Sequence, residues 1–190
     1  MTGQRHFDLA VSLGPHCRAR HQLVRVFGDA VCPSGVFDWL VAPGRAVRVY
    51  LRNQFSGTFE LDDLIVGEDG YVHAKSGTQH MHAFPRNITQ DELLDRYAEA
   101  RSRHEYLAEK TLNLFRGDRK LLLCLGARAS FHRYARLWLT IRWHFPTLKF
   151  ILLNGPRGGA PEHAEQEWKG DDSVWDRHLK SFKPGQSGGA

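Results

Sequence analysis

Residues 7–26, FDLAVSLGPHCRARHQLVRV, contain a cysteine in a setting that favours nucleophilic chemistry. Apolar residues 9–13 predict a strand, Gly14 begins a tight turn, and the apolar spacing from Leu23 onward predicts a helix. Cys17 then falls in the first turn of this helix, where free N–H groups and the positive end of the helix dipole stabilise an anion. We therefore expect Cys17 to have more thiolate character than an ordinary cysteine.

The residues around this cysteine favour the same chemistry. His16, Arg18 and Arg20 are basic neighbours that stabilise a thiolate. The alternative is that Cys17 is a small apolar side chain packed under a turn. The chain has three cysteines and no CxxC pair, which argues against a disulfide framework and a structural zinc site and favours a reducing compartment.

Cysteine catalysis also needs an imidazole that shuttles the proton. Among the 11 histidines, we select His82, because it ends a strand-like stretch bounded by Pro85, where a side chain can be fixed and still reach a cleft. His80 lies two residues earlier, shares the same face of a strand and is the alternative. Either histidine could instead be an ordinary exposed strand residue.

A third group must orient the imidazole, and Asp38 is the favoured candidate. Its neighbours in VFDWL are bulky and apolar, so its carboxylate is constrained rather than freely solvated. An aspartate that caps a turn or pairs with an arginine is the alternative interpretation of Asp38. Asp176 and Asn154 are the other candidates for the third position, and Asn154 follows a buried strand, where site residues of α/β sheets collect.

The elements that must position these residues alternate between strand and helix. This order predicts an α/β fold, with a layered, mostly parallel sheet flanked by helices and a β-hairpin insertion. The 190 residues suit a single α/β domain over 1–182, followed by a flexible C-terminal tail at 183–190. Expected strands are 9–13, 121–125 and 150–153, expected helices are 45–54, 89–116, 130–144 and one within 171–182, and the hairpin is 71–85.

Composition excludes few functions. A hydrophobic content of 42% and a charged content of 25% are typical of a soluble globular protein, and the net charge of +5 comes mostly from scattered arginines. No apolar signal core begins the chain and no stretch is long enough to span a membrane, so we expect a cytoplasmic protein that does not interact with membranes. The arginines do not form a continuous basic row, and the sequence contains no motif typical of nucleic-acid-binding proteins, so nucleic acid is not an expected partner.

Three motifs, DLAVSLGPHC, VFDWL and HAF, together resemble the family of predicted papain-like cysteine peptidases that carries a domain-of-unknown-function label. Members of that family read roughly as a strand, SLGxxC, a PFDW-type segment and HDF, and the resemblance covers about Asp8 to Pro85. Val36 stands where the family usually has proline, and Ala83 where it has aspartate. The positions that match family motifs are Cys17, Asp38, Trp39, His82 and Phe84.

The resemblance and the residues together predict acyl transfer through an acyl-enzyme on Cys17, without a cofactor. The expected substrate is an acyl-bearing small molecule, a carrier-bound thioester or a peptide. Water as acceptor gives hydrolysis, and an amine or alcohol gives an acyltransferase. We assign Cys17, His82 and Asp38 to catalysis, and substrate contacts to Gly14, His16, Trp39 and Phe84.

Two other classes of function remain open in the sequence. The first is a non-catalytic module that keeps the fold and binds a ligand or partner in the cleft. The second is a metal site at His73, His80 and His82. No carboxylate or cysteine stands at a spacing typical of metal ligands, so we expect no metal. GPHC has a single glycine, so a nucleotide phosphate loop is a weak alternative.

Overall fold

The computed structural model describes residues 4–157 and 168–185. At its centre is a sheet of three parallel strands in the order β2 (Leu9–Ser12), β5 (Leu121–Cys124) and β6 (Phe150–Leu153). The central strand β5 is buried along its whole length, which explains its unbroken apolar sequence LLLC. The predicted α/β fold with a parallel sheet is confirmed.

Helices cover both faces of this sheet, and alternate strand residues contribute to two separate cores. Helices α1 (Arg18–Phe27) and α5 (Asp172–Leu179) pack on one face, where Ala10 and Leu122 point. On the other face lie α2, α4 and the C-terminal half of α3, packed against Val11 and Leu123. These helices span Gly44–Arg52, Phe131–His144 and Gln90–Arg116, respectively. We call this assembly the sheet region.

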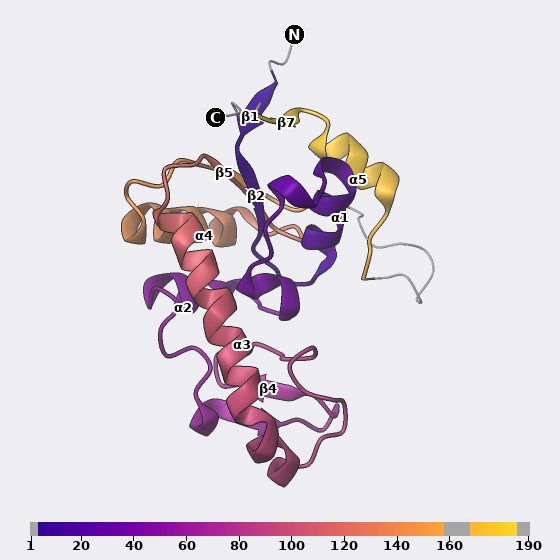
Figure 1. Cartoon of the computed structure of the whole chain (residues 1–190). Helices are drawn as coiled ribbons and strands as arrows, with labels where there is room; N and C mark the ends of the chain where they lie inside the picture. The colour runs from indigo at the N-terminus through magenta and orange to yellow at the C-terminus, as the bar shows by residue number, and fades with distance from the viewer. Residues whose placement is uncertain (1–3, 158–167, 186–190) are drawn as a thin grey trace.

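The 27-residue helix α3 extends from the sheet region into a second region, as Figure 1 shows. There its N-terminal half packs on a two-stranded antiparallel sheet of β3 (Leu64–Val66) and β4 (Val72–Ala74). A third core holds this part together, built around Phe59, Phe84 and Leu93. We call residues 55–104 the hairpin region. Short 3-10 helices occur at Asp29–Val31 (η1), Val36–Trp39 (η2) and Leu61–Asp63 (η3).

Two predicted boundaries are wrong. The hairpin insertion exists, but its strands are β3 and β4, one arm earlier than expected. Of the predicted second arm, only Gln79 forms bridges, with Val41 and His73, and residues 81–84 form a turn. The predicted tail at 183–190 also begins too early, because β7 (Phe182–Pro184) pairs in parallel with β1 (Arg5–Phe7). Residues 186–190 lie outside the described residues.

No helix in the described parts of the chain is both long and apolar enough to cross a membrane.

Candidate active site

Cys17 lies above the carboxyl ends of two parallel strands, where sites of α/β sheets gather. It is the N-cap residue of α1, five residues after the end of β2. The Gly126 N–H, just beyond β5, donates to the Gly14 carbonyl at 2.6 Å. A Cβ on Gly126 would lie 3.3 Å from the Gly14 carbonyl oxygen and 3.4 Å from that of His16. The missing side chain of Gly126 therefore lets the cysteine loop sit directly over β5.

Cys17 is the one partly exposed cysteine of the three, since Cys32 and Cys124 are fully buried. Burial raises the pKa of the Cys17 thiol above its ordinary value of 9.0, and the nearby Asp38 acts in the same direction. The lowering effects of the Cys17 peptide N–H and of Arg18 are smaller. Our expectation of more thiolate character than in an ordinary cysteine is therefore wrong, and Cys17 needs a base to become a nucleophile.

Asp38 lies in η2 and is only 5% exposed. Its Oδ2 accepts a hydrogen bond from the Gly35 N–H at 2.8 Å and lies 3.6 Å from Arg20 Nε. Its Oδ1 is buried and has no hydrogen-bond partner among the described residues. Burial raises the pKa of Asp38 to about 7, against the lowering effects of the Gly35 N–H and Arg20. Asp38 therefore caps a turn and pairs with an arginine, and its carboxylate does not orient His82.

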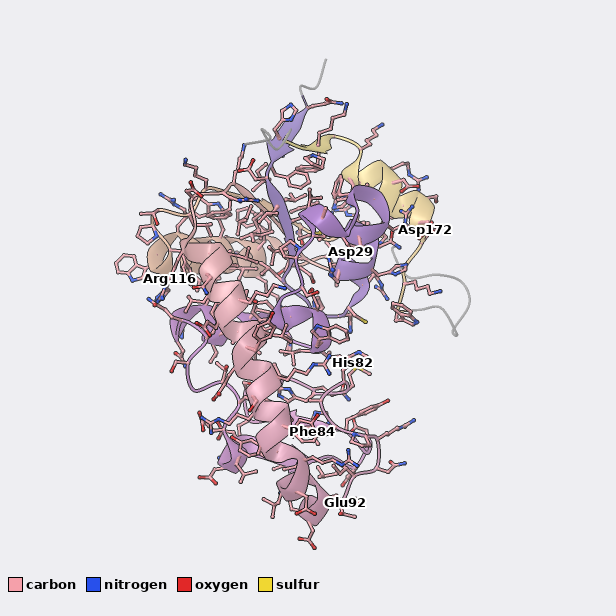
Figure 2. All side chains as sticks on the ribbon, in the orientation of Figure 1. Asp29, His82, Phe84, Glu92, Arg116 and Asp172 are labelled. Carbon is pink, nitrogen blue, oxygen red and sulfur yellow. The ribbon has the colours of Figure 1, made fainter. Side chains whose placement is uncertain are left out.

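His82 is exposed and lies against Trp39, the residue that follows Asp38. The two rings are 5.7 Å apart, edge to face at 88°. On Trp39, the Arg103 guanidinium from α3 lies 5.0 Å from the ring centroid. In Figure 2, the labelled His82 lies between Phe84 of the hairpin region and the part of the sheet region marked by Asp29. Because residues 81–84 form a turn, His82 and His80 do not share a strand face.

Backbone hydrogen bonds connect the histidine segment to the cysteine loop. The Ala42 N–H donates to the Pro15 carbonyl at 3.0 Å, and Val41 exchanges two hydrogen bonds with Gln79, at 3.0 and 2.9 Å. Residues 38–42 are thus a bridge between the loop of Cys17 and the turn of His82. The three segments chosen from the sequence do come together. Among the described residues, no hydrogen bond joins the Cys17 sulfur to His82.

The alternative histidine, His80, lies in a different environment. It is fully buried, and its ring lies 4.7 Å from that of Phe59 and 6.0 Å from that of His104. Burial lowers the pKa of His80 to about 3, and His104 acts in the same direction. His73 instead pairs with Asp69 at 2.9 Å. Within the described ranges, no three His, Cys, Asp or Glu side chains form a group that could hold a metal ion.

The remaining predicted residues have packing roles or lie at the loop. Phe84 is buried and stacks on Phe59 at 6.1 Å, so the predicted substrate contact at Phe84 is wrong. The Asn154 side chain bonds both the N–H and the carbonyl of Ala129, at 2.7 and 2.9 Å. Asp176 pairs with Arg25. Asn154 therefore fixes the loop before α4, and Asp176 joins α5 to α1. Gly14 and His16 flank the cysteine turn, Gly14 buried and His16 exposed.

Sequence reasoning missed Arg103 and His104, which α3 brings to this site. Together with Trp39, His80 and His82, they line a cavity of about 30 Å³. His104 also lines a larger groove of about 330 Å³ between α3 and residues 54–60. On a 27-residue helix rich in charge, neither residue stands out. Only their contact with segments far away in the sequence identifies them.

No protein-family model, curated protein or solved structure matches the chain. The resemblance to papain-like cysteine peptidases therefore stays a prediction from three short motifs, and the function has to be argued from the site.

Proposed function

We propose that the protein is a cysteine-dependent acyl-transfer enzyme, with Cys17 as nucleophile and His82 as general acid and base. The observation that carries the proposal is the bridge of residues 38–42. It bonds to the loop of Cys17 at one end and to the segment of His82 at the other. A thiol and an exposed imidazole from segments 65 positions apart in sequence (82 minus 17) are thus held on neighbouring loops.

The reaction needs no group outside the protein and its substrates. His82 takes the thiol proton as the Cys17 sulfur attacks the carbonyl carbon of an amide or thioester. The bond to the leaving amine or thiol breaks, and that group leaves with the proton from His82, so a thioester remains on Cys17. Water, an amine or an alcohol then attacks this thioester and gives its proton through His82 to the released sulfur. Water yields hydrolysis, and the other acceptors yield a transferred acyl group.

The start of α1 supplies the polar surroundings for this chemistry. The first N–H groups of a helix have no carbonyl acceptor within it, so those after Cys17 can donate to the oxyanion that forms at the attacked carbonyl. Asp38 is a positioning residue, because its bond to the Gly35 N–H fixes the η2 turn that carries Trp39 against His82. Catalysis is therefore assigned to a cysteine and histidine pair.

One alternative has an observation in its favour. Burial raises the pKa of Cys17, and its sulfur makes no hydrogen bond with His82 in the described structure. Both features suit a binding module in which Cys17 is a packing residue. In a working enzyme they require that the hydrogen bond from sulfur to imidazole shortens only when substrate binds, which is common in cysteine and serine enzymes.

The first test is alkylation by iodoacetamide, followed by mass spectrometry of each cysteine. Cys17 should react fastest, because burial shields Cys32 and Cys124 and raises the pKa of both thiols, that of Cys32 to about 12. His82→Ala should slow the reaction of Cys17. His73→Ala is the matched control, since the His73 side chain pairs with Asp69 and does not line the cavity beside His82, and it should leave the rate unchanged.

The second test is turnover of a panel of acyl thioesters, amides and peptides. Cys17→Ala should abolish turnover, and His82→Ala should lower kcat/KM by about 10²-fold to 10⁴-fold. In wild type, intact mass should show the acyl group on Cys17. Equal, slow labelling of the three cysteines, together with no turnover of any member of the panel, would overturn the proposal and leave the binding module.

A further inference from the structure

The cavity beside Trp39 and His82 is small and rich in hydrogen-bond donors. Its volume of about 30 Å³ has room for roughly two water-sized groups, because one water needs about 10–15 Å³ on this measure. Its polar side chains are His80, His82, His104, Arg103 and the Trp39 indole, and the rest of the lining is aliphatic. No carboxylate lines it. The cavity therefore suits a group that accepts hydrogen bonds or carries negative charge.

His80 leaves one polar atom without a partner in the wall of this cavity. The side chain is fully buried, its Nε2 lies 3.4 Å from Thr78 Oγ1, and its Nδ1 has no hydrogen-bond partner among the described residues. Burial lowers the pKa of His80 to about 3, so the imidazole is neutral and one nitrogen carries the hydrogen. In the tautomer with the hydrogen on Nδ1, the Thr78 hydroxyl donates to Nε2 and Nδ1 is a donor that lacks an acceptor, and an acceptor bound in the cavity selects this tautomer. An unmet donor of this kind destabilises the empty cavity, so an acceptor bound there is favoured.

Arg103 supplies an unpaired positive charge to the same cavity. Its guanidinium lies on the Trp39 ring at 5.0 Å, and no carboxylate within the described ranges forms an ion pair with it. Arg101, only two residues earlier on α3, differs in this respect, because it pairs with Glu60 at 3.1 Å and with Glu105 at 2.7 Å. The planar guanidinium of Arg103 can therefore still bind a carboxylate through two parallel hydrogen bonds.

We propose that this cavity binds a carboxylate at the far end of the acyl group, so that the enzyme transfers acyl groups derived from dicarboxylic acids. The inference rests on the proposed function. Arg103 pairs with the carboxylate, His80 Nδ1 donates to one of its oxygens, and the Trp39 ring covers the methylene groups between the carboxylate and the reacting carbonyl. A neutral acyl group of the same length offers no acceptor to the Arg103 guanidinium or to His80 Nδ1, so it should bind less tightly.

The kinetic test compares a succinyl thioester with a butyryl thioester, which has the same number of acyl carbons. In wild type, kcat/KM for the succinyl compound should exceed that for the butyryl compound by about 10-fold or more. Arg103→Gln should lower kcat/KM for the succinyl compound by about 10-fold or more and so remove most of this preference. Arg101→Gln is the matched control and should keep the preference. Equal kcat/KM values in wild type would overturn the cavity assignment while the acyl-transfer function stands.

The binding test needs no catalysis. Cys17→Ala protein is titrated with succinate and, separately, with butyrate, and the histidine ring nitrogens are followed by NMR. Succinate should shift the Nδ1 resonance of His80, and Arg103→Gln should weaken this binding about 10-fold or more. If succinate binds this way but no acyl compound turns over, the cavity assignment stands and the acyl-transfer function fails. If succinate leaves His80 unchanged, the cavity holds only water and the assignment is overturned.

Discussion

The sheet region and the hairpin region both bury titratable groups, but burial shifts the pKa values of these groups in opposite directions. In the sheet region, burial raises the pKa of Asp38 to about 7, so the carboxyl is partly neutral near physiological pH. In the hairpin region, burial lowers the pKa of His80 to about 3 and that of His104 to about 4, so both imidazoles are neutral. Both regions thus avoid buried charge, one by retaining a proton and the other by losing it.

The two regions also differ in what positions their polar groups. Cys17 is placed by regular structure, namely the end of a parallel strand, a turn and the start of a helix. His82 and Arg103 are placed by contacts with one indole ring, that of Trp39. A side chain held by backbone geometry tolerates changes in surrounding side chains, whereas groups held by ring contacts depend on those contacts. The predictions below test this difference.

The largest expected effect comes from removing the central ring of the hairpin region. Phe59 contacts the rings of His80, His104, Phe84 and Tyr97 at distances of 4.5 to 6.1 Å. Phe59→Ala should lower the free energy of unfolding by about 3–5 kcal/mol. It should also move the pKa values of His80 and His104 toward 6.5, because solvent enters around them. Urea unfolding and NMR titration measure the two effects.

Leu123→Ala is the matched change in the sheet region. Leu123 is fully buried on β5, so its truncation should cost about 2–5 kcal/mol. The histidine pKa values should stay where they are in wild type. If Leu123→Ala shifts them as far as Phe59→Ala does, the two regions share one environment and the comparison fails.

The next effect is a pH dependence of opposite sign in the two regions. The unfolded chain binds protons to His80 and His104 near pH 6.5, but the folded protein binds them only near pH 3 to 4. Stability from these histidines is therefore full above pH 6.5 and is lost as the pH falls toward their folded pKa values. Asp38 is protonated near pH 7 when folded and near pH 3.8 when unfolded, so its contribution is full below pH 3.8 and is lost as the pH rises through 7.

Urea unfolding at pH 5 and pH 7 separates these contributions. Asp38→Asn keeps an acceptor for the Gly35 N–H and removes the opposing carboxylate, so stability should rise more steeply from pH 5 to pH 7 than in wild type. His80→Leu should make the same rise shallower. Two variants that change the slope in the same direction would contradict the assignment of opposite protonation shifts.

The smallest expected effect concerns the N-terminus of α3. The Thr89 hydroxyl accepts from the Glu92 N–H at 3.3 Å, and the Glu92 carboxylate accepts from the Thr89 N–H at 2.9 Å. Thr89→Ala should cost about 1 kcal/mol. Hydrogen exchange should speed up in the first turns of α3 and stay unchanged in β5. Faster exchange in β5 as well would mean that the helix start supports the sheet region directly.

Sequence predicted those parts of the molecule that local pattern determines. The strands expected at 121–125 and 150–153 and the helix expected at 89–116 are confirmed, because strand burial and helix starts depend on nearby residues. The segments that form the site were also identified. The details of the site were not, because they depend on partners far away in sequence.

Three residues show why the details of the candidate site could not be predicted from the sequence. Gln79 pairs with Val41 rather than continuing a strand, which puts His82 in a turn. The thiol of Cys17 is governed by burial more than by the helix start, and no local pattern encodes how deeply a side chain is buried. Arg103 is one arginine among many until α3 lies against Trp39.

His104 has a further consequence through its position between two spaces. The same imidazole lines the small cavity beside Trp39 and the open groove of about 330 Å³ on the other side. It is held there by stacking on Phe59 at 4.5 Å and by its Nε2, which lies 3.4 Å from both the Tyr50 hydroxyl and Thr58 Oγ1. One aromatic ring thus borders both spaces, and a smaller residue at this position would join the cavity to the groove.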